Sequence, residues 1–423
     1  MSEDTVSTGL GRRCLISIAG LAALELMSRV SLLSFTPTSF LSLHSDPNGI
    51  SLGEIGLVPF VSSFMLVEWV ALLIPPLRKL RETRDGRRSL IRASVALGVV
   101  LALVQGHALG LWGESVRFTL STTGLLAEFG GGLSFGLVMT AAVTLGSVAT
   151  LGLALWVSRR GLGNGFSLIL VMTSARDVLN APADTIPTST LFDPFVLAIA
   201  VIAFVTLHHG RKASANAPNG FWFVLPAAGV VPLTLAAAIV ALSYSLSNLG
   251  VSVPEVLLAD ATTLRGTITL AALTTVLSVV LGLIFYSRSA IRTTFQRYGI
   301  DGTASPRFPI ALSAVVMGIV CFAEYGSLTN GSVVTAATIF VWVAVALDVW
   351  NEYAFRREHG ALEVHTVLHR VLEVPLLLAE LDRAKRPALA RGFAHRSLLH
   401  FFGPYIPIEV LVPTKDRANA AAG

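Results

Sequence analysis

Residues 52–105 read LGEIGLVPFVSSFMLVEWVALLIPPLRKLRETRDGRRSLIRASVALGVVLALVQ, and this stretch decides the fold class. Two apolar runs, each close to the roughly 20 residues that cross a hydrocarbon core as a helix, flank a strongly basic segment. Two membrane-spanning helices joined by a positively charged loop account for this pattern. The same alternation of apolar runs and basic loops continues along most of the chain.

The composition points to lipid as the solvent for much of the surface. Only 13% of the 423 residues are charged, and 53% are hydrophobic. A soluble domain carries about 25% charged residues, so this chain cannot cover a water-exposed surface in the usual way. The formal net charge of +5 comes from short clusters between apolar runs rather than from a patch beside aromatic residues, which argues against a nucleic-acid partner.

We predict about ten transmembrane helices, with the first apolar run retained as a helix rather than cleaved as a signal. Basic residues fill every alternate loop, which predicts that both termini are cytoplasmic and requires an even number of spans. The predicted spans are 13–35, 52–75, 90–112, 134–157, 165–182, 191–209, 221–247, 264–287, 306–325 and 333–353.

The last part of the chain predicts a small cytosolic α+β domain over residues 355–423. LEVHTVLHRV alternates like a strand, EVPLLLAELDRAKR has helical periodicity, and PALARGF and PIEVLVP indicate two further strands. His365 and His369 have the spacing of a metalloprotease motif, but the glutamate of that motif is missing. We therefore predict a β-α-β-β domain with no metal site and no enzymatic activity.

Three groups of residues resemble the SecY family in order and spacing. The first lies in the stretch quoted above, the second opens the fifth span, and the third, PAAGVVP at 226–232, opens the seventh with Pro226 in place of the family's asparagine. The matching residues are Pro59, Phe60, Ser62, Ser63, Pro75, Gly86, Arg87, Arg88 and Gln105; Arg160, Gly161, Gly163, Asn164, Gly165 and Ser167; and Ala228, Gly229, Val230 and Pro232.

This resemblance implies an all-α polytopic membrane protein with two inverted five-helix halves, residues 1–182 and 183–354. It implies a protein-conducting channel subunit that translocates or inserts polypeptides in the bacterial plasma membrane, without a cofactor. The implied partners are the translocating polypeptide, membrane lipid, and SecE-like and SecG-like small subunits. The loops between spans six and seven and between eight and nine, where family members dock SecA or the ribosome, are reduced here, which argues against coupling to either.

The resemblance also assigns site residues. A ring of apolar side chains would close the pore, and the second and seventh helices would line a lateral gate. The implied ring is Leu57, Val61, Phe166, Leu170, Thr234 and Ala346; the implied gate residues are Ser62, Ser63, Glu68, Gly229 and Pro232; the implied cytoplasmic loop residues are Arg87, Arg88, Arg160 and Asn164. Thr234 and Ala346 lack apolar bulk, and simple helix packing remains the alternative role for all six ring residues.

Two other hypotheses stay open at this point. Inverted repeats with proline-interrupted helices also describe small-molecule transporters. A non-conducting scaffold that displays the C-terminal domain is the other, and that domain faintly resembles a small family of signal-transducing domains. Among the charged residues within spans, we expect Glu25 and Arg29 to pair four residues apart, and Asp348 to act as an interfacial cap rather than as a proton relay.

Overall fold

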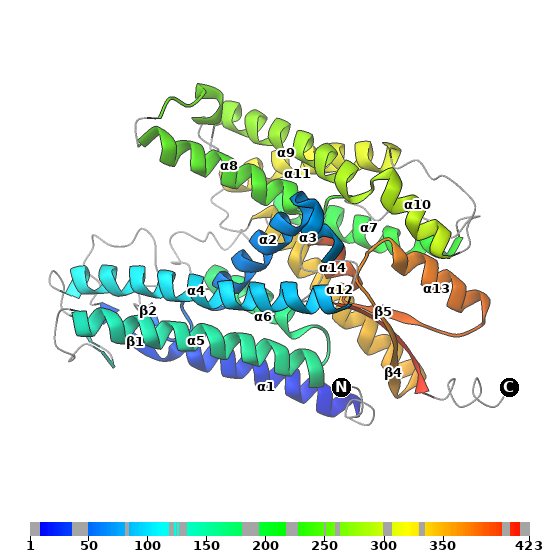
Figure 1. The fold of residues 1–423 in the computed structure, drawn as a ribbon, viewed down its shortest axis with the longest axis horizontal. Helices are drawn as coiled ribbons and strands as arrows, with labels where there is room; N and C mark the ends of the chain where they lie inside the picture. Colours follow the sequence, from blue (N-terminus) through cyan, green and yellow to red (C-terminus); the bar gives the residue numbers. More distant parts are fainter. Residues whose placement is uncertain are drawn as a thin grey trace. The chain divides into compact units, whose positions relative to one another are not determined.

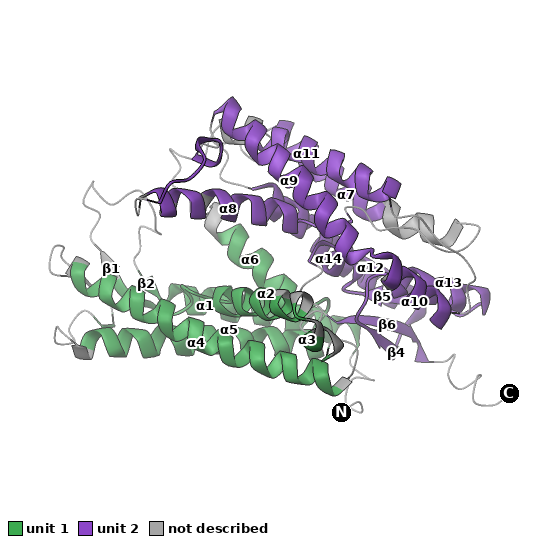
Figure 2. Cartoon of the chain, turned by 45° about the horizontal axis from the view of Figure 1, so that its top comes forward, with its two compact units in different colours: residues 1–180, 404–406 green, residues 181–403, 407–423 purple. Residues whose placement is uncertain are grey.

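The computed structural model describes residues 9–35, 50–80, 84–117, 122–123, 125–126, 133–179, 194–216, 227–248, 251–258, 263–298, 307–329, 335–399 and 407–414. The chain divides into two compact units, residues 1–180 with 404–406 and residues 181–403 with 407–423 (Figure 2). The predicted division into three domains stays a prediction, but the predicted C-terminal domain falls within the second unit except for residues 404–406.

The first unit is a group of helices with a small sheet at one end. The strands β1 (Ser31–Phe35), β2 (Ile50–Ser51) and β3 (Thr122–Thr123) are antiparallel in the order β2-β1-β3. Leu33 and Ile50 of this sheet pack against Phe135 and Met139. The helices are α1 (Leu10–Arg29), α2 (Val58–Leu73), α3 (Pro75–Leu80), α4 (Arg84–Arg117), α5 (Leu133–Arg160) and α6 (Gly165–Leu179).

Small residues bring α4 and α5 close together, and the two helices lie side by side in Figure 1. A Cβ atom added to Gly110 would lie 2.8 Å from the carbonyl oxygen of Gly136, and one added to Gly106 would lie 3.1 Å from that of Thr140. Because lipid gives no hydrophobic force between helices, such close backbone packing is a principal source of attraction.

The second unit contains a further group of helices and the C-terminal domain. α9 and α11 run side by side (Figure 1), where the thiol of Cys321 donates to the hydroxyl of Thr274 at 3.4 Å. The helices are α7 (Pro194–Asn216), α8 (Val231–Asn248), α9 (Leu264–Phe285), α10 (Arg288–Arg297), α11 (Arg307–Thr329) and α12 (Ala336–His359), with the 3-10 turn η2 (Glu255–Leu258).

The C-terminal domain is a three-stranded antiparallel sheet in the order β4-β6-β5 with two helices. Val374 and Leu381 of its longer helix pack against Val410 and Val412 of the sheet. The three predicted strands and the helix after the first of them are present, but a second helix, α14, lies between the last two strands, so the order is β-α-β-α-β rather than β-α-β-β. The elements are β4 (Leu362–Leu368), α13 (Glu373–Arg383), β5 (Leu389–Arg391), α14 (Phe393–Leu398) and β6 (Ile408–Pro413).

Each of the ten predicted spans coincides with a helix, but the count of ten crossing helices is only partly supported. Among the described residues, five helical segments are long and apolar enough to cross a membrane: 85–115, 135–160, 264–285, 307–324 and 336–359. Four shorter apolar segments lie at 58–68, 165–176, 194–208 and 231–244.

The predicted first span, 13–35, was too long at its C-terminal end. The helix ends at Arg29, and residues 31–35 form β1, with Ser31 opposite Ser51 and Leu33 opposite Ile50. An apolar run does not distinguish a helical turn from a buried strand when its partner is distant in sequence.

Two other spans begin later than predicted. α2 starts at Val58 rather than near 52, because Gly56 has a positive φ of 50° and Pro59 occupies the first turn, where a missing N–H costs nothing. α8 starts at Val231 rather than near 221, because Gly229 has a positive φ of 62°. Residues 221–226, including Pro226, lie outside the described residues.

We predict that Gly110→Ala destabilises the first unit by about 1–3 kcal/mol, because the added methyl group meets the Gly136 carbonyl, a backbone atom that cannot rotate away. Gly152 of α5 is the matched control, since a Cβ there has no neighbour within 4 Å. Gly152→Ala should be neutral or stabilise by up to about 1 kcal/mol. Thermal unfolding of the purified chain in detergent measures both, and equal stability of the two variants would contradict the packing argument.

Candidate functional site

Four of the six predicted ring residues lie on α2 and at the start of α6 in the first unit. Leu57 and Phe166 are buried, whereas Val61 and Leu170 are half-buried. The rings of Phe64 and Phe166 bring the two helices together, with 5.6 Å between their centroids. α2 and α6 therefore meet through an aromatic contact, which both the ring and the helix-packing interpretations allow.

The predicted gate residues of α2 are held by their own helix and by α4. The Ser63 hydroxyl is buried and donates to the carbonyl of Phe60 at 2.8 Å. A Cβ on Gly98 of α4 would collide with the Phe60 ring, so the glycine lets this ring pack against α4. Ser62 is half-buried, and Glu68 is buried with 3% of its surface exposed.

The glycine-rich segment before α6 is a hydrogen-bonded turn. Asn164 caps α6, since its side-chain oxygen accepts from the Ser167 amide at 3.2 Å. The Gly165 amide donates to the Ser158 hydroxyl at 2.8 Å, and the Leu162 amide donates to the Ser17 hydroxyl of α1 at 2.8 Å. Asn164 therefore orders the entry to α6.

The predicted loop arginines lie at helix ends. Arg160 is exposed at the end of α5. Arg88 is exposed in the first turn of α4, where it pairs with Asp85 at 3.5 Å, while Arg87 is half-buried. An exposed pair of this kind contributes little to stability, so Arg88 remains available to a partner.

The remaining predicted residues belong to the second unit. Thr234 of α8 and Ala346 of α12 are exposed, and the Thr234 hydroxyl donates to the carbonyl of Val231 at 3.0 Å. Gly229 and Pro232 are buried at the start of α8. The ring and gate roles of these residues stay predictions.

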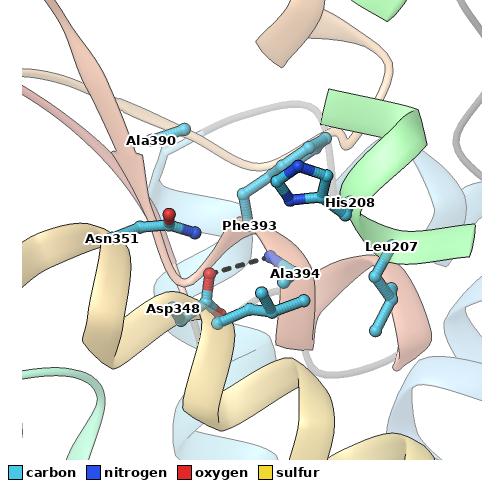
Figure 3. Close-up of a pocket in the computed structure, with 8 residues that line it drawn as sticks. Leu207, His208, Asp348, Asn351, Ala390, Phe393 and Ala394 are labelled. Atoms are coloured by element: carbon cyan, nitrogen blue, oxygen red, sulfur yellow. Dashed lines mark hydrogen bonds between the residues drawn. The ribbon is translucent and has the colours of Figure 1, made fainter. Parts of the chain in front are cut away.

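Asp348 joins α12 to the C-terminal domain, as Figure 3 shows. Its two carboxylate oxygens accept from the backbone amides of Ala394, at 3.0 Å, and His395, at 2.9 Å, in the first turn of α14. Asp348 and Ala394 border a cavity of about 20 Å³, which Asn351 of α12 and Leu207 of α7 also line. Asp348 therefore caps a helix of the C-terminal domain, α14, while its predicted place at the membrane interface stays a prediction.

A buried charge cluster strengthens the same junction. Glu352 of α12 accepts from Arg356 at 2.8 Å and pairs with Arg391 of β5 at 3.2 Å. Arg391 also pairs with Glu409 of β6 at 3.1 Å. Burial alone lowers the pKa of Arg391, but the nearby carboxylates of Glu352 and Glu409 outweigh it and raise that pKa above its ordinary value. Arg391 is therefore charged, and the carboxylates of Glu352 and Glu409 balance its charge.

The segment after α9 forms another contact with the C-terminal domain. Ile291 and Phe295 of α10 pack with Leu372 and Leu376, next to the start of α13. Arg297, at the end of α10, pairs with Glu373 at 2.6 Å. The predicted loop between the eighth and ninth spans is thus partly helical, and its apolar face is covered.

Several of these residues escaped the sequence analysis. Glu352 and Arg356 have a helical spacing that could have revealed their pairing, as the same spacing did for Glu25 and Arg29, which pair at 2.8 Å. No comparable signal exists for Arg391, whose partners are 39 and 18 residues away in sequence. A buried ion pair between distant elements is set by the tertiary fold.

Taken with the apolar helices, this architecture defines a multi-pass helical membrane protein. The SecY family model matches residues 51–317, which is more than half of the chain. The chain therefore belongs to the SecY family.

Two relatives illustrate the similarity. The protein translocase subunit SecY of Diacronema lutheri is 28% identical over 159 residues, which cover 37% of this chain and 35% of the relative. The protein translocase subunit SecY of Pseudomonas aeruginosa is 25% identical over 225 residues, covering 47% of this chain and 48% of the relative. The similarity thus spans between a third and a half of the length of these relatives.

The fold is similar to a solved channel structure. Sec61 in the canine ribosome-channel complex from the endoplasmic reticulum has a TM-score of 0.50 and 13% sequence identity, covering 84% of this chain and 95% of that one. At this identity the match supports the channel fold alone.

We predict that Arg391→Met destabilises the C-terminal domain by about 3–5 kcal/mol, because it leaves buried Glu352 short of one of its two cations. Arg383 is the matched control: it is exposed on α13 and has no ion pair among the described residues. Arg383→Met should change stability by less than about 0.5 kcal/mol. Limited proteolysis of the full chain measures both, and equal resistance of the two variants would contradict this role.

We also predict an acid-sensitive C-terminal domain. Burial, and secondly the charge of Arg396, lower the pKa of His395 from 6.5 to about 3. The unfolded domain therefore takes up a proton as the pH falls through 6.5, while the folded domain does not, and stability is lost below that pH. The loss between pH 7.5 and 5.0 should be about 2 kcal/mol.

Hydrogen-exchange protection factors for the α14 amides, corrected for intrinsic rates, measure this loss. His395→Gln cannot be protonated, so its protection should change less between the two pH values. The same pH dependence in both proteins would rule His395 out as the cause.

Proposed function

We propose that the chain is the pore-forming subunit of a protein-conducting channel, which translocates polypeptides or inserts them into the membrane. The family match over residues 51–317 carries this proposal. The two compact helical units support it, since a channel of this type is built from two halves. We expect no catalytic chemistry from the chain itself.

The proposed barrier to ions is an apolar constriction. Such a constriction blocks ions by excluding water and needs no charged gate. Leu57, Val61, Phe166 and Leu170 of the first unit supply apolar bulk, which a passing chain can displace and later release. Thr234 and Ala346 of the second unit are exposed and small. We therefore propose a constriction that seals less tightly than one formed by six bulky residues.

The proposed setting is the bacterial plasma membrane, with both termini cytoplasmic. The proposed partners are the translocating polypeptide, surrounding lipid, and SecE-like and SecG-like small subunits. In this arrangement residues 1–182 and 183–354 form the two halves of the channel, and residues 355–423 form a cytosolic domain.

Coupling to SecA or to a ribosome is not part of the proposal. The segment between α9 and α11 offers a short helix, α10, whose apolar residues Ile291 and Phe295 already pack against the C-terminal domain. An external partner would find only the polar face of α10, including the exposed Arg288 and Arg292. The small-molecule transporter and the non-conducting scaffold are not favoured, since family membership gives neither of them support.

Site-specific photocrosslinking tests conduction. A photoreactive residue at Val61 or Leu170 should crosslink to a polypeptide arrested during translocation, because both side chains are half-buried on the proposed pore lining. Leu145 of α5 is the control, since it is 67% exposed on an apolar helix and should crosslink to lipid. Crosslinks only to lipid and neighbouring helices at all three positions would overturn the proposal.

A further inference from the structure

The start of α8 lies directly against the end of α14. The amide of Val230 donates to the carbonyl of Leu398 at 3.0 Å, across 168 residues of sequence. Val230 is the N-cap of α8, since its own carbonyl accepts from the amides of Leu233, at 3.1 Å, and Thr234, at 3.3 Å. The amide of an N-cap residue has no partner within its own helix, and here a carbonyl of the C-terminal domain satisfies it.

Gly229 makes this contact possible. It has a φ of +62°, and a Cβ at this position would collide with the carbonyl oxygen and carbonyl carbon of Leu398. Only a residue without a side chain fits between the two backbones. Ala227, two residues before Gly229, is fully buried, and its amide donates to the Ser313 hydroxyl of α11 at 2.8 Å.

The contact joins complementary ends of two helices. The last carbonyls of a helix and the first amides of another both lack partners within their own helix. Leu398 is the last residue of α14, and Val230 precedes the first residue of α8. Partial negative charge at the end of α14 therefore meets partial positive charge at the start of α8.

The other end of α14 is fixed to α12. Asp348 accepts from the amides of Ala394 and His395, so α14 is held at its start by α12 and at its end by α8. Arg396 of α14 also donates to the Leu399 carbonyl at 2.6 Å, which orders the chain just after the contact with α8. All of these groups belong to the second unit.

We propose that the C-terminal domain is an intramolecular restraint on α8: α14, capped by Asp348, holds the start of α8 in one position through Leu398 and Gly229. The start of α8 cannot shift without breaking this contact, so a partner that displaces the C-terminal domain also frees α8. The consequence for conduction rests on the proposed function, whereas the restraint itself does not.

Hydrogen exchange of the full-length chain in lipid nanodiscs tests the restraint. Asp348→Ala leaves the sequence of α8 unchanged and removes the cap at the far end of α14. Losing a helix cap of this kind corresponds to about fivefold to tenfold in local opening. We expect this acceleration both in α14 and in the first turn of α8, at the amides of Val231, Leu233 and Thr234, with unchanged exchange at residues 240–248. Faster exchange in α14 with wild-type exchange in the first turn of α8 would overturn the proposal.

Gly229→Ala provides an independent test with a matched control. It should release both α14 and the start of α8, because the added methyl group collides with Leu398. Gly360 also has a positive φ, +77°, but a Cβ there has no neighbour within 4 Å. Gly360→Ala should leave α8 as protected as in the wild type, and equal loosening of α8 by both variants would show that backbone strain alone is responsible.

These outcomes are separate from the test of conduction. Photocrosslinking at Val61 or Leu170 can succeed while the exchange of α8 is unaffected by Asp348→Ala, which would leave a channel without this restraint. Conversely, photocrosslinking can fail while Asp348→Ala still accelerates exchange in α8. That result would leave a restrained helix in a protein that does not conduct polypeptides.

Discussion

The constraint behind this structure is that lipid cannot hydrogen-bond to a peptide group. Every backbone amide and carbonyl in the hydrocarbon region must find a partner within the protein, and helices satisfy this within one segment. Polar side chains follow the same rule. The hydroxyls of Thr140, Ser94 and Thr150 each donate to the carbonyl four residues earlier, at 2.6, 2.8 and 2.9 Å. Helix association then depends on close packing, which Gly106 and Gly110 provide between α4 and α5.

The helices could be predicted from the sequence because that constraint acts locally. A run of apolar residues long enough to cross the hydrocarbon region satisfies its backbone as a helix, and each of the ten predicted spans contains one. The ends of those helices depend on distant groups. Ser31 joins a strand because Ser51 lies opposite it. α14 and α10 are short helices whose packing involves residues far away in sequence, such as Asp348 and Leu376.

The candidate site divides in the same way. Asn164 could be recognised from its motif, and its role as a helix cap is a local one. Asp348 could be predicted as a cap, but its partners, 46 and 47 residues away, could not. The position of Gly229 in a family motif marked it as special without showing that Leu398 is what it accommodates. A sequence motif identifies a residue with a structural role, but only the tertiary structure shows which group that residue contacts.

The way in which α12 enters the C-terminal domain limits how that domain could be exchanged between proteins. Glu352 of α12 neutralises Arg391 in the sheet of the domain. Asp348 of α12 caps α14, and Leu376 packs with Ile291 of α10. A fusion made at residue 360 would transplant a domain that lacks Asp348, Glu352 and the apolar side chains of α10 that pack against Leu372 and Leu376. A transferable unit would have to include the polar end of α12. The recipient protein would also need a matching amphipathic segment after its eighth span.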